Sequence, residues 1–279
     1  MSLNRVIYLP LATYPEAIPD ASILAAAGFA QSLGSTLQVT TFAVEIPHLS
    51  SPIGNLLIDV PGLIHETEER SRAECDRLHG ILKSAAGSHA ALHCTSRKVV
   101  LSAALDAAAA DARYFDLVVL PWCGETAAAG EMAQAIVFGS GRPAILVPPS
   151  GRPAALDHVA IAWDGSRFAA RALGDALPLL AGGRRVSVLT VQDEKPLSGP
   201  DLAASLASSL ERRGFDAAPI AIQLGKRTIA EALQDTALAE GAGALVMGGF
   251  GHSRLRDFIL GGATKGVLAN LRLPTLISH

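Results

Sequence analysis

Three glycines near the end of the chain have a spacing that suits a phosphate-binding loop. Gly248, Gly251 and Gly261 follow the pattern G-x2-G-x9-G after the apolar run 244–247, and a stretch with helical character begins at Ala263. Glycine lets backbone N–H groups approach a ligand without an intervening Cβ. The first amides of a helix lack intrahelical partners and lie at the positive end of its dipole. The sequence therefore predicts a phosphate-binding loop between a strand and a helix.

The loop between these glycines also contains side chains that could act on a ligand. Arg254 or Arg256 could hold a phosphate, because a guanidinium matches phosphate oxygens; the alternative is a solvated or interface-packed basic loop. His252 and Ser253 are adjacent, and no acidic residue is placed to orient a catalytic histidine, so nucleophilic catalysis is not expected. No cluster of His, Cys and Asp has zinc-binding spacing. These residues favour binding over catalysis.

A regular alternation of apolar strands and amphipathic helices must position these residues in the second half. We expect strands at 158–163, 186–191, 218–224, 244–247 and 274–278, and helices at 167–180, 201–213, 228–240 and 263–271. Continuous apolar strands that alternate with helices predict a parallel sheet covered on both faces, with right-handed crossovers. Ser166 is the expected N-cap of the first of these helices.

The first half repeats the same plan. We expect strands at 6–9, 37–44, 90–95, 117–120 and 144–147, and helices at 21–33, 64–84, 99–112 and 131–138. The segment FDLVVLPWCG (115–124) matches GALVMGGFG (243–251). The sequence thus predicts a duplication into domains 1–150 and 153–279, joined by a short linker rich in proline and glycine. Residues 48–63 form an extra loop, for which surface packing is favoured over a lid or a partner contact.

The composition excludes several classes of function. The net charge is -3 and aromatic residues make up 5% of the chain, which argues against a nucleic-acid-binding surface. The N-terminus lacks the pattern of a signal peptide, and polar residues interrupt the uncharged stretch 21–44. Three cysteines without CxxC spacing are typical of a reducing compartment. We therefore expect a soluble cytoplasmic protein that binds neither nucleic acid nor a membrane.

A duplicated parallel α/β unit that ends in G-x2-G-x9-G resembles the universal stress protein family in its tandem, two-domain form. The resemblance covers the whole chain and includes GHSRLRD, LGGATKGVL and LPTLISH. It implies two doubly wound five-stranded parallel sheets with strand order 3-2-1-4-5. It also implies an adenine-nucleotide site where the first and fourth strands end, the place that open α/β sheets generally use for ligands. The implied ligand is ATP, AMP or ADP, with or without Mg²⁺.

The resemblance assigns the site to the second half. It places Asp164 near the adenine and ribose, where a carboxylate can accept a ribose hydroxyl. It places Val191 against the adenine. The complete set of implied nucleotide-binding residues is Ala162, Trp163, Asp164, Val191, Met247, Gly248, Gly251, Gly261, Gly262, Ala263 and Thr264.

One position of this site departs from the family pattern. The residue after the last motif glycine is usually Ser or Thr, and here it is Gly262. A hydrogen bond from a hydroxyl to a charged phosphate contributes about 1.5–3 kcal/mol. The amides of 262–264 and the hydroxyl of Thr264 remain available to a phosphate. We expect binding to survive, with a preference for a nucleotide that has fewer phosphates.

The first half departs much further from the family pattern. Pro121 occupies the first glycine position and has no N–H to donate, Glu131 takes the phosphate-turn position, and no acidic residue follows strand 6–9. We expect this half not to bind ATP in the family manner.

The resulting functional hypothesis is an adenine-nucleotide-binding stress-response or regulatory protein, with binding favoured over enzymatic activity. The alternatives are a protein-interaction scaffold with a vestigial site, for an unknown partner, and a slow ATPase. In single-domain relatives the last strands pair between subunits, so we expect 144–147 to pair with 275–278 within this chain. This arrangement is an intramolecular pseudo-dimer, which could itself form a homodimer.

Overall fold

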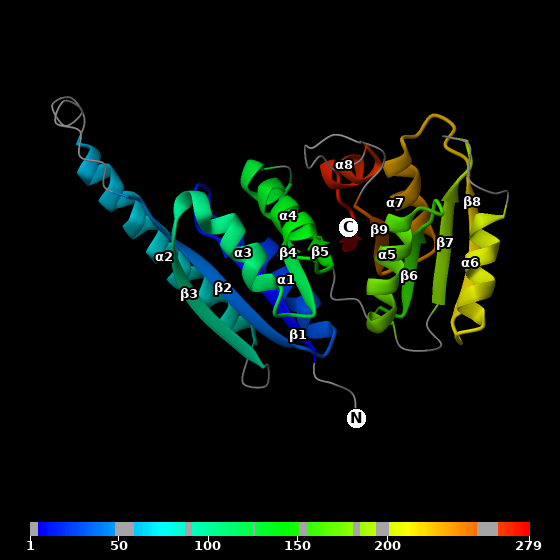
Figure 1. The fold of residues 1–279 in the computed structure, drawn as a ribbon, viewed down its shortest axis with the longest axis horizontal. Helices are drawn as coiled ribbons and strands as arrows, with labels where there is room; N and C mark the ends of the chain where they lie inside the picture. Colours follow the sequence, from blue (N-terminus) through cyan, green and yellow to red (C-terminus); the bar gives the residue numbers. More distant parts are fainter. Residues whose placement is uncertain are drawn as a thin grey trace.

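The computed structural model describes residues 5–47, 59–86, 91–124, 126–150, 156–180, 185–193, 201–249 and 262–279. In the first half, strands and helices alternate as expected (Figure 1). The strands are β1 (Val6–Ala12), β2 (Thr36–Glu45), β3 (Leu92–Val100), β4 (Leu117–Pro121) and β5 (Ala144–Val147). The helices are α1 (Asp20–Ser32), α2 (Val60–Ala86), α3 (Ala104–Ala112) and α4 (Ala127–Gly139).

The second half has the same order of elements. Its strands are β6 (His158–Ala162), β7 (Arg185–Val191), β8 (Asp216–Ile222), β9 (Ala244–Gly248) and β10 (Thr275–Ser278). Its helices are α5 (Arg167–Ala176), α6 (Leu202–Glu211), α7 (Ile229–Ala239) and α8 (Gly262–Ala269). Side chains cap the first turns of two of these helices. Ser166 caps α5, and Thr228 forms a capping box with Glu231 at the start of α7.

Several expected boundaries were wrong. Strand β1 continues to Ala12 instead of ending at residue 9, and α4 begins at Ala127 instead of residue 131. Two further differences lie at the end of the molecule formed by α2 and β3. Helix α2 begins at Val60, so the end of the expected loop 48–63 is helical, whereas 48–58 lie outside the described residues. Strand β3 continues to Val100, although a helix was expected from residue 99. The reason is tertiary, because β3 pairs with β2 as far as Glu45 opposite Val100, and ladder pairing overrides weak local preference.

All ten strands belong to one sheet, in the order β3-β2-β1-β4-β5-β10-β9-β6-β7-β8. Each half therefore has the expected order 3-2-1-4-5. The two expected five-stranded sheets join into one, because β5 pairs antiparallel with β10, with Ile145 opposite Leu276. This is the predicted pairing of 144–147 with 275–278. The other strand pairs are parallel.

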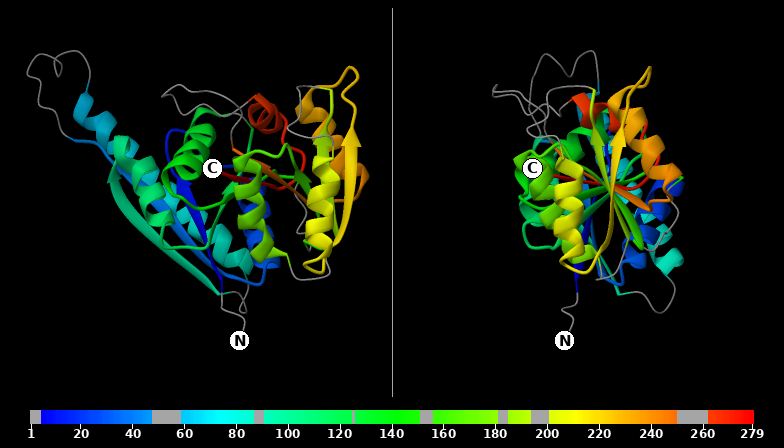
Figure 2. Two further views of the ribbon diagram at one scale, coloured as in Figure 1. Left: turned by 45° about the vertical axis from the view of Figure 1, so that its right-hand side comes forward. Right: turned by 90° about the vertical axis from the view of Figure 1, so that its right-hand side faces the viewer.

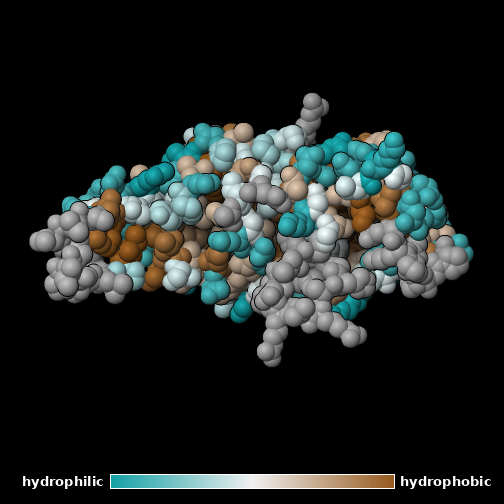
Figure 3. Space-filling view, turned by 90° about the horizontal axis from the view of Figure 1, so that it is seen from above, coloured by the Kyte–Doolittle hydropathy of each residue, from teal (hydrophilic) through white to brown (hydrophobic). Residues whose placement is uncertain are grey.

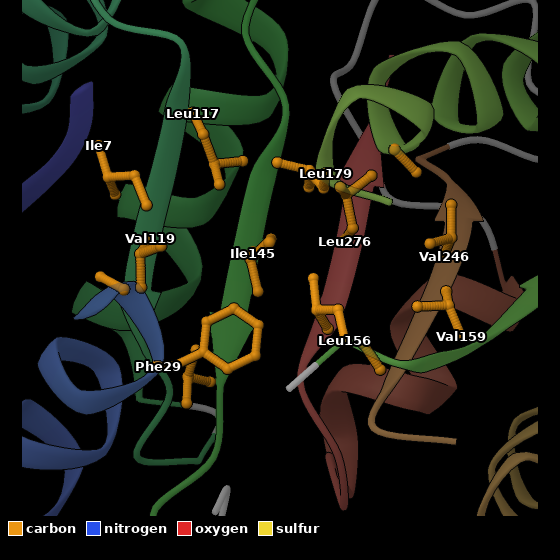
Figure 4. Packing of buried hydrophobic residues seen from close by; sticks show 14 of the residues in the cluster. Ile7, Phe29, Leu117, Val119, Ile145, Leu156, Val159, Leu179, Val246 and Leu276 are labelled. Atoms are coloured by element: carbon orange, nitrogen blue, oxygen red, sulfur yellow. The ribbon is translucent and has the colours of Figure 1, made fainter. Parts of the chain in front are cut away.

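Helices cover both faces of the sheet. In the right panel of Figure 2, α6 and α7 lie on opposite sides of the strands. Two buried apolar clusters result, and each spans both halves. Figure 4 shows part of one cluster, where Ile145 from β5 and Leu276 from β10 lie between side chains of the two halves. The core is thus continuous across the junction.

The expected boundary between the two domains falls at residues 150–153. Residues 151–155 lie outside the described part of the chain, so this boundary stays a prediction. Among the described residues, no helix is both long enough and apolar enough to cross a membrane.

Candidate functional site at the ends of β6 and β9

The sheet brings Trp163 and Gly248 together at the carboxyl ends of β6 and β9. These strands are parallel neighbours with Ile161 opposite Val246, so the residues that follow lie at the same edge. Both backbone polar groups of Trp163 bond to β7. Its N–H donates to Leu189 O (2.8 Å), and its carbonyl accepts from Thr190 Oγ1 (2.8 Å). This edge is the point where the strand order reverses, which is the usual ligand position in such sheets.

Asp164 lies in the turn that connects β6 to α5. Its Oδ1 accepts a hydrogen bond from Ser166 N (3.0 Å), and Gly165 has a φ of 73°, in the left-handed region that favours glycine. Ser166 Oγ accepts from Ala169 N (3.2 Å) and caps α5, as expected. Asp164 is half-buried. The turn therefore holds a carboxylate beside the first turn of a helix.

Gly248 is required by close packing. A Cβ at this position would lie 2.8 Å from the backbone carbonyl carbon of Phe168 and 2.9 Å from Ala169 N. The first turn of α5 can therefore approach the end of β9 only because residue 248 has no side chain. This contact is a reason for the glycine that motif spacing did not reveal.

The first turn of α8 also contacts Gly248. Thr264 is buried, and its Oγ1 donates to the carbonyl oxygen of Gly248 at 3.2 Å. We expected this hydroxyl to be available to a phosphate, but here its proton is used within the protein, because it satisfies a carbonyl at the end of a strand. The two bonding partners are sixteen residues apart in sequence, so the contact depends on the fold.

Gly262, the first residue of α8, lies in open space. A Cβ there would meet no atom of the described residues within 4 Å, and its φ is outside the left-handed region. The N–H groups of Gly262, Ala263 and Thr264 belong to the first turn of α8, where amides lack intrahelical partners. A groove of about 360 Å³ runs beside this turn and continues between α7 and α8 as far as Asn270 and Arg272. These amides are the described groups best suited to an anion.

The remaining predicted residues fall into three groups. Ala162 and Val191 are partly buried and pack on the same apolar cluster, at the ends of β6 and β7. Met247 is buried in that cluster, so it is a core residue first. Gly251, Gly261, Arg254 and Arg256 lie outside the described residues, and their roles stay predictions.

At the equivalent edge of the first half, β4 ends in Pro121, and Glu131 is exposed on α4. A small cavity of about 50 Å³ lies there, next to Pro10 and Pro121. Neither proline can donate a backbone hydrogen bond. That this half lacks the family phosphate site stays a prediction.

Contacts from the first half reach the second-half site, and sequence reasoning missed them. Trp122 Nε1 donates to the carbonyl of Leu268 in α8 (3.0 Å). If residue 249 had a Cβ atom, that atom would lie 3.3 Å from Cγ1 of Val137 in α4. Both contacts join segments more than 100 residues apart, which no local pattern could indicate.

His279 joins the two halves by ring contacts. It stacks on Phe168 (5.1 Å between centroids) and meets Phe138 of α4 edge-on (5.2 Å). Burial, together with the nearby Arg167, lowers the pKa of His279. His279 thus lies at the interface between the two halves.

Comparison with known proteins agrees with this arrangement. Residues 155–279 match the model of the universal stress protein family. A universal stress protein from Archaeoglobus fulgidus DSM 4304 has a similar structure, with 14% identity, a TM-score of 0.68 and 99% of each chain covered. Sequence comparison with curated proteins gives no match.

Two further solved structures are less similar. A functionally unknown protein from Pseudomonas aeruginosa PAO1 has 12% identity and a TM-score of 0.48, with 99% of this chain and 92% of that one covered. A universal stress protein in complex with cAMP has 19% identity and a TM-score of 0.31, with 44% and 96% covered. The whole chain therefore shares the fold of the Archaeoglobus protein, and residues 155–279 match the model of the universal stress protein family.

Proposed function

We propose that the second half binds an adenine nucleotide at the ends of β6 and β9, and that the protein acts as a stress-response regulator. The observation that carries this proposal is the meeting of two helix starts at Gly248. The first turn of α5 packs against this residue, and Thr264 of α8 bonds to its carbonyl. Two helix N-termini at one strand end favour an anion there.

The parts of the nucleotide follow from the chemistry of the surrounding residues. Asp164 would accept a ribose hydroxyl. Ala162 and Val191 would pack against the adenine, since both are partly buried apolar residues at neighbouring strand ends. The amides of Gly262, Ala263 and Thr264 would hold a phosphate.

The phosphate contact in this proposal depends on backbone groups. Gly262 has no hydroxyl, and the hydroxyl proton of Thr264 is directed to Gly248 O. The loss of both side-chain donors favours AMP or ADP over ATP, and reduces the need for Mg²⁺. Arg254 and Arg256 are additional candidates for phosphate contacts.

A protein-interaction scaffold with a vestigial site is the second candidate. It is favoured by Gly248 and Thr264, because the structure gives both residues a packing or bonding role without any ligand. A slow ATPase is a weaker candidate, since no residue of the described site is placed as an assured general base. A cytoplasmic location stays a prediction from the sequence.

Isothermal titration with AMP, ADP and ATP, each with and without Mg²⁺, tests the proposal. Asp164→Asn keeps the acceptor for Ser166 N and removes the charge, so it should weaken nucleotide binding without loss of the turn. Asp201→Asn is the matched control, because Asp201 is exposed and makes no side-chain cap bond. Wild-type protein that releases no heat with any nucleotide would favour the scaffold instead.

A further inference from the structure

Strand β3 forms one edge of the ten-stranded sheet (Figure 1). It is nine residues long, and most of its side chains from His93 to Lys98 are exposed. Apolar side chains also gather at this end of the molecule (left in Figure 3), where Val100 is 39% exposed. An edge strand of this length offers a row of backbone groups to another strand.

The hydrogen bonds to β2 show which backbone groups face outward. Ala91 O accepts from Leu37 N (2.8 Å), and the register places Leu37 opposite Leu92. In a parallel ladder the N–H and C=O of one residue point to the same side, and successive residues alternate. Residues 93, 95, 97 and 99 therefore face β2. The outward residues are Leu92, Cys94, Ser96, Lys98 and Val100, and each has an N–H.

The opposite edge of the sheet differs in this respect. Gln192 N donates to Ile222 O (3.1 Å), so the outward residues of β8 are Ala217, Pro219 and Ala221 by the same alternation. Pro219 has no N–H, and proline at an outward position prevents a further strand from pairing. Edge β8 is blocked at its centre, whereas edge β3 is uninterrupted.

Charged residues on an edge strand commonly oppose pairing with another strand, and β3 carries two of them, Arg97 and Lys98. Arg97 Nη1 is paired with Asp111 Oδ1 (2.6 Å) within its own chain. A second β3 in antiparallel orientation overlaps all nine residues when the pairing is centred on Ser96. Lys98 then lies opposite Cys94 and Arg97 opposite Thr95, so no like charges face each other.

The same register also matches the apolar ends of the strand. Leu92 lies opposite Val100, which gives the exposed Val100 an apolar neighbour. The five outward residues of each chain would exchange about ten backbone hydrogen bonds. We propose that β3 is a self-association edge, which pairs antiparallel with β3 of a second copy around Ser96 and extends the sheet across a two-fold axis.

Cross-linking tests this register directly. Ser96 faces its own symmetry mate at a Cα separation of about 5.5 Å, within the range of about 4.4–6.8 Å that a disulfide spans. Mild oxidation of the Ser96→Cys variant should give a covalent dimer that a reducing agent reverses. Ala221→Cys, at an exposed outward position of β8, is the control, and the wild type gives the background from Cys94 and Cys123. Equal cross-linking of the two variants overturns the proposal.

Light scattering tests the edge without a new cysteine. The wild type should show twice the 28.8 kDa of one chain. Ser96→Pro removes an outward N–H, so it should return the mass to that of one chain. It removes no backbone hydrogen bond to β2 and loses only the side-chain hydrogen bond to Thr41 Oγ1 of β2 (2.9 Å). Ala221→Pro on β8 should leave the dimer intact, and circular dichroism checks that both variants fold. A wild type that stays a single chain, or a dimer that Ser96→Pro leaves unchanged, overturns the proposal.

Discussion

The missing hydroxyl at residue 262 gives the sharpest test of the nucleotide site. A serine side chain at this position would project into open space, because a Cβ at Gly262 meets no described atom within 4 Å. Its hydroxyl would lie on the first turn of α8, beside the amides that we assign to the phosphate. Gly262→Ser should therefore strengthen binding without a change in the fold.

The magnitude follows from the bond that is added. A hydrogen bond to a charged group contributes about 1.5–3 kcal/mol, and about 1.4 kcal/mol changes an equilibrium constant tenfold. Gly262→Ser should therefore lower the Kd for ADP by about 10- to 100-fold. Gly262→Ala is the matched control, because it adds the same Cβ and also raises helix propensity, but without the hydroxyl.

Isothermal titration of the wild type and both variants with ADP and with adenosine isolates the contribution of the hydroxyl to phosphate binding. Adenosine has no phosphate, so the serine and alanine variants should bind it equally. If these two variants also bind ADP equally, the first turn of α8 does not hold the phosphate, and the assignment of the amides of 262–264 is refuted. Binding by none of the three proteins would refute the nucleotide site itself.

The remaining predictions concern stability. Gly248→Ala should lower the free energy of unfolding by about 1–3 kcal/mol, because the new methyl group overlaps the backbone at Phe168; a chemical denaturation curve that matches Gly262→Ala would contradict the packing role. Trp122→Phe leaves the buried carbonyl of Leu268 without its donor and should cost about 1–3 kcal/mol by the same measurement. Burial lowers the pKa of His158, so the unfolded chain takes up a proton first, and stability should fall as pH drops below about 6.5. Tm values of the wild type and His158→Gln at about pH 7.5 and about pH 5.5 check this, and an equal fall in both would exclude His158 as a cause.

Much of the fold could be predicted because its determinants are local. Apolar runs with helices between them marked every strand, and Ser166 marked the start of α5 by its capping chemistry. The strand order 3-2-1-4-5 and the pairing of 144–147 with 275–278 came from the family resemblance, and the ladders confirm both. The extension of β3 to Val100 was missed, because it depends on pairing with a long β2.

The site was predictable only in part. The spacing of glycines pointed to the end of β9, and Asp164 lies in the turn after β6, where it was expected; the roles of these residues in binding stay predictions. The sequence could not show why Gly248 is a glycine, because the reason is the backbone of Phe168, eighty residues earlier. It also could not show that the hydroxyl of Thr264 bonds to Gly248 O.

The sequence by itself determined the duplication, the alternation of strands and helices, and the loss of phosphate-binding groups in the first half, because each is a property of residue types along the chain. Only the tertiary structure decided that both apolar clusters span the two halves, and that α4, Trp122 and His279 of different segments contact the end of β9, α8 and the start of α5. These contacts join residues far apart in sequence, and their energies depend on close approach, which no pattern along the chain records.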